Sequence, residues 1–240
     1  MKNLYMPIKA IVTQIEEHSK DVKLFRFKRE KGVFPKNREG LIFIPGQFVM
    51  AGLWGYGEAP FGLLSSPFEN RFGEVLVKRT GIVTSALHRL KVGEELTVRG
   101  PYGNGFPIDF FEEKDIVLVS GGCGIPPVAA LVEYIIKNRK RFGRIYLLYG
   151  AAAPQDILVK DKLNKWSKHI NVLLTVDRPA KGWKGYVGMG SEIVKEIEVD
   201  PMDAAAAMCG PVPMTEAFQK KFIELGVAAS RIHFEEFNFR

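Results

Sequence analysis

The residues best suited to chemistry form a glycine turn inside the stretch DIVLVSGGCGIPPVAALVEYI, between two apolar segments. Gly121, Gly122 and Gly124 carry no side chains that would keep a ligand away from the backbone. Pro126 and Pro127 suit the first turn of a helix, where a missing N–H group costs nothing. The N–H groups and the dipole of a helix start favour an anion such as a pyrophosphate. The stretch therefore predicts a strand, an anion-binding turn and a helix.

Two later segments add similar chemistry. The segment MCGPVPM again sets a cysteine, a glycine and prolines before a helix, and YGAAAPQDIL sets small residues and then Asp156 after a strand. Taken alone, the first turn has two interpretations, because tight strand–helix connections also use glycine for steric reasons and the G-x-G-x-x-G spacing is absent. Cys209 alone is also explained as a small buried apolar residue. The repetition favours ligand binding, since open parallel sheets bind ligands at their carboxyl edge.

The bulk properties restrict the class of protein. Two cysteines, Cys123 and Cys209, are too few for a disulfide framework or a four-thiolate metal site. The net charge is +7 and the pI is near 9.3, but Lys and Arg are spread without a dense arm. This favours an acidic ligand or partner protein over nucleic acid. We expect no membrane span, because no apolar run approaches about 18–20 residues. Early acidic residues argue against a secretory signal and predict a cytoplasmic protein.

The first half of the chain reads as short strands separated by turns. At least five strands are predicted, at YMPIKAIVTQIEE, KDVKLFRFKRE, LIFIPGQFVMAGLWG, GEVLVKRT and EELTVRGPYG. This spacing is typical of a sandwich or a small barrel. A short helix, SALHRLKVG, interrupts them, with Thr84 or Ser85 as its expected N-cap. Leu87 and Leu90 are expected to face inward, and Gly93 to end the helix.

The pattern changes after about residue 111. Continuous apolar runs, typical of strands buried on both faces of a parallel sheet, alternate there with helical segments. The strands are predicted at DIVLVSG, RIYLLYGA, NVLLTVD and AAAAMCGP. We therefore expect two domains, with the β-rich domain over residues 1–110 and an α/β doubly wound parallel sheet over residues 111–240.

Together and in this order, the motifs resemble those of the ferredoxin–NADP reductase superfamily over nearly the whole chain. The similarity is greatest to the electron-transfer subunits of dihydroorotate dehydrogenase, anaerobic sulfite reductase and bidirectional hydrogenase. The segments that carry it are PGQFV, GEAPFGLLSSP, GGCGIPPVAALVEY, LLYGA and CGPVPM. The resemblance implies an antiparallel Greek-key β-barrel that binds a flavin, FAD rather than FMN. It also implies that the following α/β domain binds a nicotinamide nucleotide.

The resemblance assigns the flavin to two segments of the barrel. Where the family has an arginine–x–aromatic–serine motif, this chain has the residues APFG. Ala59 therefore stands in place of the arginine, and Gly62 in place of the serine. Phe61 is expected on the flavin ring, which is expected at the domain interface. The implied flavin contacts are Pro60, Phe61, Gly62, Leu63, Ser65, Val77, Lys78 and Arg79, and the implied pyrophosphate contacts are Gly81, Ile82, Val83 and Thr84.

The resemblance also assigns the nicotinamide nucleotide to residues of the second domain. The implied contacts are Gly121, Gly122, Cys123, Gly124, Ile125 and Pro126 at the pyrophosphate, together with Gly150, Ala151, Asp156, Cys209, Gly210, Pro211 and Met214. Cys209 is expected beside the nicotinamide, so Cys209, Phe61 and Phe237 are the implied catalytic positions. Phe237 either covers the flavin where the nicotinamide enters or, with Phe239, closes the core of the last strand, and both interpretations stay open.

The sequence favours NADH over NADPH. Asp156 follows the second strand of the α/β domain, and an acidic residue there suits a free ribose hydroxyl. Arg178 and Lys181 follow the third strand, and a cation at the 2′-phosphate would reverse the preference.

The resemblance implies electron transfer from NAD(P)H through the flavin to an iron–sulfur or other redox partner, within a larger complex. Many relatives carry a four-cysteine iron–sulfur site near the C-terminus. No cysteine follows Cys209 here, so we expect no cluster in this chain. A basic surface would speed docking with an acidic partner. The alternatives are a stand-alone flavin reductase for a small acceptor and a non-catalytic docking subunit with a degenerate flavin site.

Overall fold

The computed structural model describes residues 6–29 and 40–235. The chain divides into two compact units, Met1–Gly105 and Phe106–Arg240. Each unit contains one six-stranded sheet, the first antiparallel and the second parallel. This confirms the predicted order of an antiparallel β domain followed by an α/β domain.

The first unit is a sheet of antiparallel strands closed on itself. Its elements are β1 (Ile8–Glu17), β2 (Val22–Lys28), β3 (Phe48–Leu53), β4 (Gly57–Gly62), β5 (Gly73–Lys78), α1 (Ile82–His88) and β6 (Glu95–Tyr102). The strand order is β4-β3-β6-β1-β2-β5. The two end strands then meet, because Leu63 forms a bridge with Val75 and the Leu64 N–H donates to the Glu74 carbonyl at 2.9 Å. This contact just past β4 joins the two ends of the sheet and confirms the predicted barrel.

Strand β4 was not predicted from the sequence, and the composition of this strand explains why. The segment GEAPFG contains Pro60 between glycines, and proline cannot donate a ladder hydrogen bond. Pro60 is accommodated because β4 stands at the end of the strand order, where one side of its backbone needs no partner.

Helix α1 begins earlier than the sequence suggests. Gly81 is the N-cap, so neither Thr84 nor Ser85 holds that position. The Thr84 hydroxyl instead accepts hydrogen bonds from the N–H groups of Thr80 and Gly81, both at 2.9 Å, as the third residue of the helix. The helix ends at His88, before the expected end at Gly93. A threonine near a helix start can bond forward or backward, and the sequence alone does not distinguish the two.

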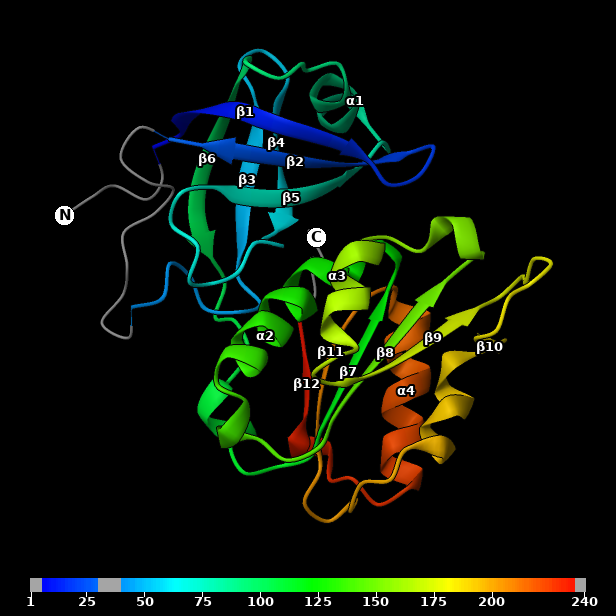
Figure 1. Ribbon diagram of the computed structural model, residues 1–240. Helices are drawn as coiled ribbons and strands as arrows, with labels where there is room; N and C mark the ends of the chain where they lie inside the picture. Colours follow the sequence, from blue (N-terminus) through cyan, green and yellow to red (C-terminus); the bar gives the residue numbers. More distant parts are fainter. Residues whose placement is uncertain (1–5, 30–39, 236–240) are drawn as a thin grey trace. The chain divides into compact units, whose positions relative to one another are not determined.

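The second unit is a parallel sheet covered by helices. Its strands are β7 (Ile116–Gly121), β8 (Ile145–Ala151), β9 (Asn171–Val176), β10 (Tyr186–Val187), β11 (Ala205–Cys209) and β12 (Ile232–Phe234), in the order β10-β9-β8-β7-β11-β12. Its α-helices are α2 (Ile125–Lys137), α3 (Lys160–Trp166) and α4 (Val212–Glu224), and its 3₁₀ segments are η1 (Ile108–Phe111), η2 (Gly122–Gly124), η3 (Arg139–Arg141), η4 (Pro154–Asp156), η5 (Gly190–Glu196) and η6 (Ala229–Arg231). Helices α2 and α3 cover one face of the sheet, and α4 with η5 covers the other (Figure 1).

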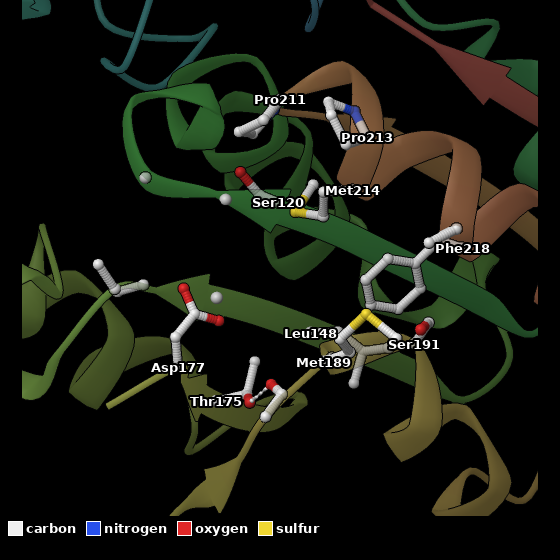
Figure 2. Close-up of a pocket in the computed structure, with 18 residues that line it drawn as sticks. Ser120, Leu148, Thr175, Asp177, Met189, Ser191, Pro211, Pro213, Met214 and Phe218 are labelled. Atoms are coloured by element: carbon white, nitrogen blue, oxygen red, sulfur yellow. Dashed lines mark hydrogen bonds between the residues drawn. The ribbon is translucent and has the colours of Figure 1, made fainter. Parts of the chain in front are cut away.

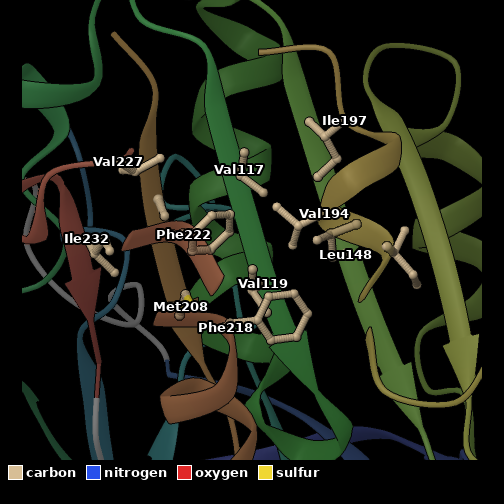
Figure 3. Close-up of a cluster of buried hydrophobic side chains, with 12 residues drawn as sticks. Val117, Val119, Leu148, Val194, Ile197, Met208, Phe218, Phe222, Val227 and Ile232 are labelled. Atoms are coloured by element: carbon tan, nitrogen blue, oxygen red, sulfur yellow. The ribbon is translucent and has the colours of Figure 1, made fainter. Parts of the chain in front are cut away.

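Two phenylalanines of α4 anchor the second face of the sheet. Phe218 and Phe222 lie 3% and 2% exposed among side chains of β7, β8, β11 and η5, as Figure 3 shows. Their ring centroids are 6.1 Å apart. Burial of such rings is a large favourable contribution to folding, because each removes an extended apolar surface from water.

We predict that Phe222→Ala lowers the free energy of unfolding by about 3–5 kcal/mol, because it opens a cavity that the sheet cannot fill. A urea titration monitored by circular dichroism measures this change in the free energy of unfolding. The neighbouring Ile223 is 48% exposed, so Ile223→Ala is the matched control and should change stability by no more than about 0.5 kcal/mol. Equal effects from the two variants would contradict this account of the core.

Candidate functional site

The glycine turn connects β7 to α2 at the carboxyl edge of the parallel sheet. Gly121 ends β7, η2 makes the turn, and α2 begins at Ile125. Gly122 has a φ of +51°, a conformation that residues with a Cβ atom rarely adopt. In the strand order, β8 lies on one side of β7 and β11 on the other. The turn therefore occupies the point where the chain reverses direction across the sheet, which is the usual ligand site of such folds.

The other two glycines of the turn are needed for packing. A Cβ atom on Gly121 would lie 2.6 Å from the Met214 sulfur. A Cβ atom on Gly124 would lie 2.5 Å from the Cys209 carbonyl oxygen and 2.7 Å from the Gly210 Cα. The turns after β7 and β11 thus touch almost backbone to backbone, an approach that only glycine allows.

Few N–H groups remain to face an anion at this turn. Pro126 and Pro127 have none, and the Ile125 N–H donates to the Gly122 carbonyl. The first turn of α2 therefore offers an anion little, and η2, which precedes it, is the better candidate to hold one.

A cavity of about 420 Å³ opens beside the turn at the carboxyl ends of β7, β8 and β9. In Figure 2, Met214 and Phe218 of α4 and Met189 project toward it from one side, with Asp177 and Thr175 on the other. The lining residues are Ser120, Gly121, Gly122, Leu148, Gly150, Ala151, Ala152, Thr175, Asp177, Gly188, Met189, Gly190, Ser191, Pro211, Pro213, Met214, Ala217 and Phe218. The lining is mostly apolar with a few polar groups, the composition expected of a cofactor pocket.

Hydrogen bonds between loops hold the polar end of the cavity. The Thr175 hydroxyl donates to the Gly188 carbonyl at 2.9 Å and so fixes the segment that carries Met189. The Asp177 N–H donates to the Ala151 carbonyl at 3.2 Å. The Asp177 carboxylate is exposed and is part of the cavity lining. A negative charge therefore stands where β9 ends.

A buried tyrosine lies behind the turn. The Tyr149 hydroxyl donates to the Gly122 carbonyl at 3.1 Å and accepts the Leu158 N–H at 3.4 Å. The side chain is fully buried, and this burial raises the pKa of Tyr149 above its usual value. The phenol is therefore a neutral donor at physiological pH.

The cavity brings together only part of the set expected from the sequence. Gly121, Gly122, Gly150, Ala151, Pro211 and Met214 line it. Cys123, Gly124, Ile125, Pro126, Asp156, Cys209 and Gly210 are not among the lining residues. Cys209 is 3% exposed at the end of β11, and Asp156 lies in η4.

Sequence reasoning passed over several lining residues, Asp177 and Phe218 among them. Asp177 closes the segment NVLLTVD, so a search for acidic residues after every strand would have found it. Met189, Gly190 and Ser191 follow the two-residue strand β10, which gave no periodic signal.

The expected flavin residues of the first unit divide by exposure. Phe61, Gly62, Leu63, Ser65, Val77 and Thr84 are buried, Pro60 and Val83 are half-buried, and Lys78, Arg79, Gly81 and Ile82 are exposed. Ile82 is 77% exposed, although isoleucine usually lies in the interior. A Cβ atom on Gly81 would meet nothing within 4 Å. The exposed start of α1 thus leaves room for a ligand.

No arginine of the adjoining strands substitutes for the motif arginine that Ala59 replaces. Arg99 is the nearest candidate in the pairing scheme, but it donates from Nε to both carboxylate oxygens of Glu58, at 2.9 and 2.8 Å. That bond raises the pKa of Arg99 and lowers the pKa of Glu58. Arg99 is therefore engaged within the barrel.

Positive charge is concentrated on the first unit. Lys and Arg outnumber Asp and Glu there by 16 to 10, against 18 to 17 in the second unit, so the first unit carries +6 of the net +7. A hollow of about 400 Å³ gathers part of this charge. Its lining residues are Glu17, Lys20, Lys23, Arg79, Ser85, His88 and Arg89.

The chain past β12 carries one unusual acid. Glu235 donates its N–H to the Met208 carbonyl at 3.0 Å, beside the end of β11. Burial raises the pKa of its carboxyl to about 7, so Glu235 exchanges a proton near neutral pH. Phe237 and Phe239 lie outside the described residues.

Two kinds of feature were not found in the part of the chain that the structure describes. Residues 6–29 and 40–235 contain no group of three or more His, Cys, Asp or Glu side chains placed to hold a metal ion. None of the helices described there combines the length and apolar character that crossing a bilayer requires.

Comparison with known proteins agrees with both units. Residues 9–106 match the family model "Oxidoreductase FAD-binding domain", and residues 118–220 match "Oxidoreductase NAD-binding domain". The sulfhydrogenase 1 subunit gamma of Pyrococcus furiosus is 32% identical over 235 residues, which cover 96% of this chain and 79% of the relative. A probable dihydroorotate dehydrogenase B electron transfer subunit of Thermococcus kodakarensis is 35% identical over 209 residues, covering 87% and 77%.

Solved structures support the fold. A ferredoxin NADP⁺ reductase from Neisseria gonorrhoeae matches 97% of this chain and 99% of its own, with a TM-score of 0.80 and 19% identity. The cytochrome b5 reductase domain of Ulva prolifera nitrate reductase matches 97% and 98%, with a TM-score of 0.78 and 22% identity. The chain thus belongs to the ferredoxin–NADP reductase superfamily, whose members combine an FAD-binding with an NAD-binding oxidoreductase domain, and its relatives include sulfhydrogenase gamma and dihydroorotate dehydrogenase electron-transfer subunits.

Proposed function

We propose that this protein takes electrons from NADH, passes them through bound FAD, and delivers them to an iron–sulfur or other redox subunit of a larger cytoplasmic complex. The observation that carries the proposal is the cavity at the carboxyl edge of the parallel sheet, in a chain whose other half matches an FAD-binding domain. When bound, the nicotinamide supplies a hydride, and the flavin accepts it and releases electrons singly.

The second unit fits a nicotinamide nucleotide. The residues of η2 offer N–H groups to a pyrophosphate, and Gly122 leaves the approach open because a Cβ there would meet nothing within 4 Å. Met189, Met214 and Phe218 offer an apolar surface for a base. Cys209 and Gly210 hold the turn after β11 against Gly124, so we assign them a role in shaping the nicotinamide side. The chain thus orients the nucleotide and excludes water from it.

Asp177, and not Asp156, is our candidate for nucleotide choice. Its carboxylate lines the cavity, where it can accept a hydrogen bond from a ribose hydroxyl and would repel a 2′-phosphate. Arg178 and Lys181 are exposed and are not among the lining residues, which supports NADH over NADPH.

The first unit supplies what an FAD needs despite the two departures from the family motif. Gly81, Ile82 and Val83 present an exposed backbone for the pyrophosphate, and Thr84 shapes that backbone through its bonds to Thr80 and Gly81. The surplus of positive charge on this unit favours a diphosphate. Pro60, Phe61, Gly62 and Leu63 of β4 and its continuation are the proposed contacts of the ring.

The same charge suits the acceptor. A basic surface on the flavin unit would steer an acidic redox protein and raise the rate of association. The hollow lined by Lys20, Lys23, Arg79 and Arg89 is the most concentrated part of that surface that we identify in the described residues.

Ala59 and Gly62 favour one competing function, a docking subunit that binds no flavin. Both the arginine and the hydroxyl of the family motif are missing, and Arg99 is engaged with Glu58. This alternative predicts a colourless protein that takes up no added FAD.

The first prediction of this proposal concerns the bound flavin. Purified protein should show flavin absorption bands that bleach when NADH is added without oxygen, because hydride transfer removes the oxidised chromophore. Visible spectroscopy makes the measurement, with buffer alone as the control. Absence of flavin before and after incubation with FAD would contradict the proposal and support the docking alternative.

A second prediction concerns nucleotide choice. Asp177→Ser should raise kcat/KM for NADPH about tenfold and lower that for NADH, because it removes a repelling charge and a ribose acceptor; tenfold corresponds to about 1.4 kcal/mol. Steady-state kinetics with both nucleotides measure it. Asp156→Ser is the matched control and should leave both values within about twofold. If Asp156→Ser changes the preference and Asp177→Ser does not, Asp156 is the residue that selects NADH over NADPH.

A third prediction concerns the basic hollow. Lys20→Glu with Arg89→Glu should slow electron delivery to a small acidic ferredoxin about fivefold at low salt, because steering depends on opposite charge. Added salt should remove the difference, since it screens exposed charges. Lys165→Glu with Lys168→Glu on the second unit is the control of equal charge change. If both double variants slow delivery equally, the hollow has no special part in docking.

A further inference from the structure

Tyr149 joins two loops behind the nucleotide cavity. Its hydroxyl donates to the Gly122 carbonyl in the glycine turn and accepts the Leu158 N–H in the segment after η4. These two segments are separated by more than thirty positions in the chain. The phenol links them, and it acts both as a donor and as an acceptor.

Tyr149 cannot touch a ligand in the cavity. Its side chain is fully buried, and it is not among the lining residues, whereas Gly122 and Gly150 are. Any effect of the phenol on the nucleotide must therefore pass through the backbone that it holds.

The bond to Gly122 sets the direction of a peptide group. In a trans peptide the C=O and the following N–H point in opposite directions, so fixing the Gly122 carbonyl also fixes the Cys123 N–H. That carbonyl also accepts the Ile125 N–H, which closes the turn from its other end. Gly122 has a positive φ, which glycine adopts without the penalty that a Cβ atom brings.

The bond to Leu158 holds a strained segment. Val159, the next residue, has a φ of +48°, which is an unfavourable conformation for a β-branched side chain. Such a conformation persists only where the surroundings impose it. The Leu158 N–H is buried, so the loss of its acceptor would leave an unsatisfied donor there.

We propose that Tyr149 is a positioning residue, whose hydroxyl holds the glycine turn in its nucleotide-binding geometry before the nucleotide arrives. The inference rests on the proposed function, because the nucleotide is the ligand of this turn. It assigns nucleotide affinity to a side chain that makes no contact with the nucleotide. The raised pKa keeps the phenol protonated over the working pH range, so the effect should not depend on pH below about pH 9.

The test is Tyr149→Phe, which removes the hydroxyl and keeps the ring. The Kd for ADP-ribose, measured by isothermal titration calorimetry on the full chain, should rise about fivefold, which corresponds to about 1 kcal/mol. The KM for NADH should rise by a similar factor. The rate of flavin reduction at saturating NADH should stay within about 1.5-fold, because the reacting groups are untouched once the nucleotide is bound.

Tyr134→Phe is the matched control. Tyr134 is 7% exposed in the same unit, and its hydroxyl accepts a bond from the Arg141 guanidinium at 2.8 Å. This variant also removes a hydrogen-bonded phenol hydroxyl, but near the far end of α2 from the glycine turn, so its Kd for ADP-ribose should equal that of the wild type. A Kd of Tyr149→Phe equal to that of the wild type would overturn the inference. An equal rise of the Kd in Tyr149→Phe and Tyr134→Phe would overturn it too.

Hydrogen exchange on the wild type tests the same idea without a variant. The Leu158 amide should be protected before ADP-ribose is added, because the proposed link exists in the free protein. Exchange at the rate of an open loop in the free protein would overturn the inference even if Tyr149→Phe fails to fold. A wild type that binds neither ADP-ribose nor NADH would instead overturn the proposed function, so the two failures are distinguishable.

Discussion

The second unit depends on one close approach between two turns. The turn after β7 and the turn after β11 meet where Gly124 touches the backbone of Cys209 and Gly210, and where Gly121 touches Met214. Side chains at these glycines would clash across this contact, and the turns are held close because β7 and β11 are hydrogen-bonded neighbours. The contact fixes where α2 and α4 begin. It therefore sets both the position of the η2 amides and the side of the cavity that α4 provides.

Chemistry and scaffold are separated along the second unit. The apolar cluster around Phe218 and Phe222 fills the space between α4 and the middle of the sheet, and the cavity begins where that cluster ends. Phe218 belongs to both, because it packs in the cluster and lines the cavity. Rigid packing thus continues into the site without a flexible layer between them, which suits a protein whose task is to hold cofactors in place.

The two units differ in electrostatic character as well as in fold. The barrel holds nearly all of the net positive charge, while the α/β unit is close to neutral and places an acid, Asp177, at its cavity. This division suits the proposed flavin diphosphate and acidic acceptor on one unit, and the proposed NADH on the other. The charge count comes directly from the sequence, but its meaning appears only when the chain is divided between units.

The amino-acid sequence was enough to predict the two sheets, the order of the domains and the glycine turn. These depend on local patterns, such as alternating or continuous apolar runs and the glycines and prolines that end them. Strand β4 and the cap of α1 were missed, because an edge strand tolerates proline and a threonine can bond in either direction. Only the tertiary structure placed Asp177 at the cavity and Tyr149 behind the turn. Both depend on which strand ends lie side by side, and that is decided by packing between segments far apart in the chain.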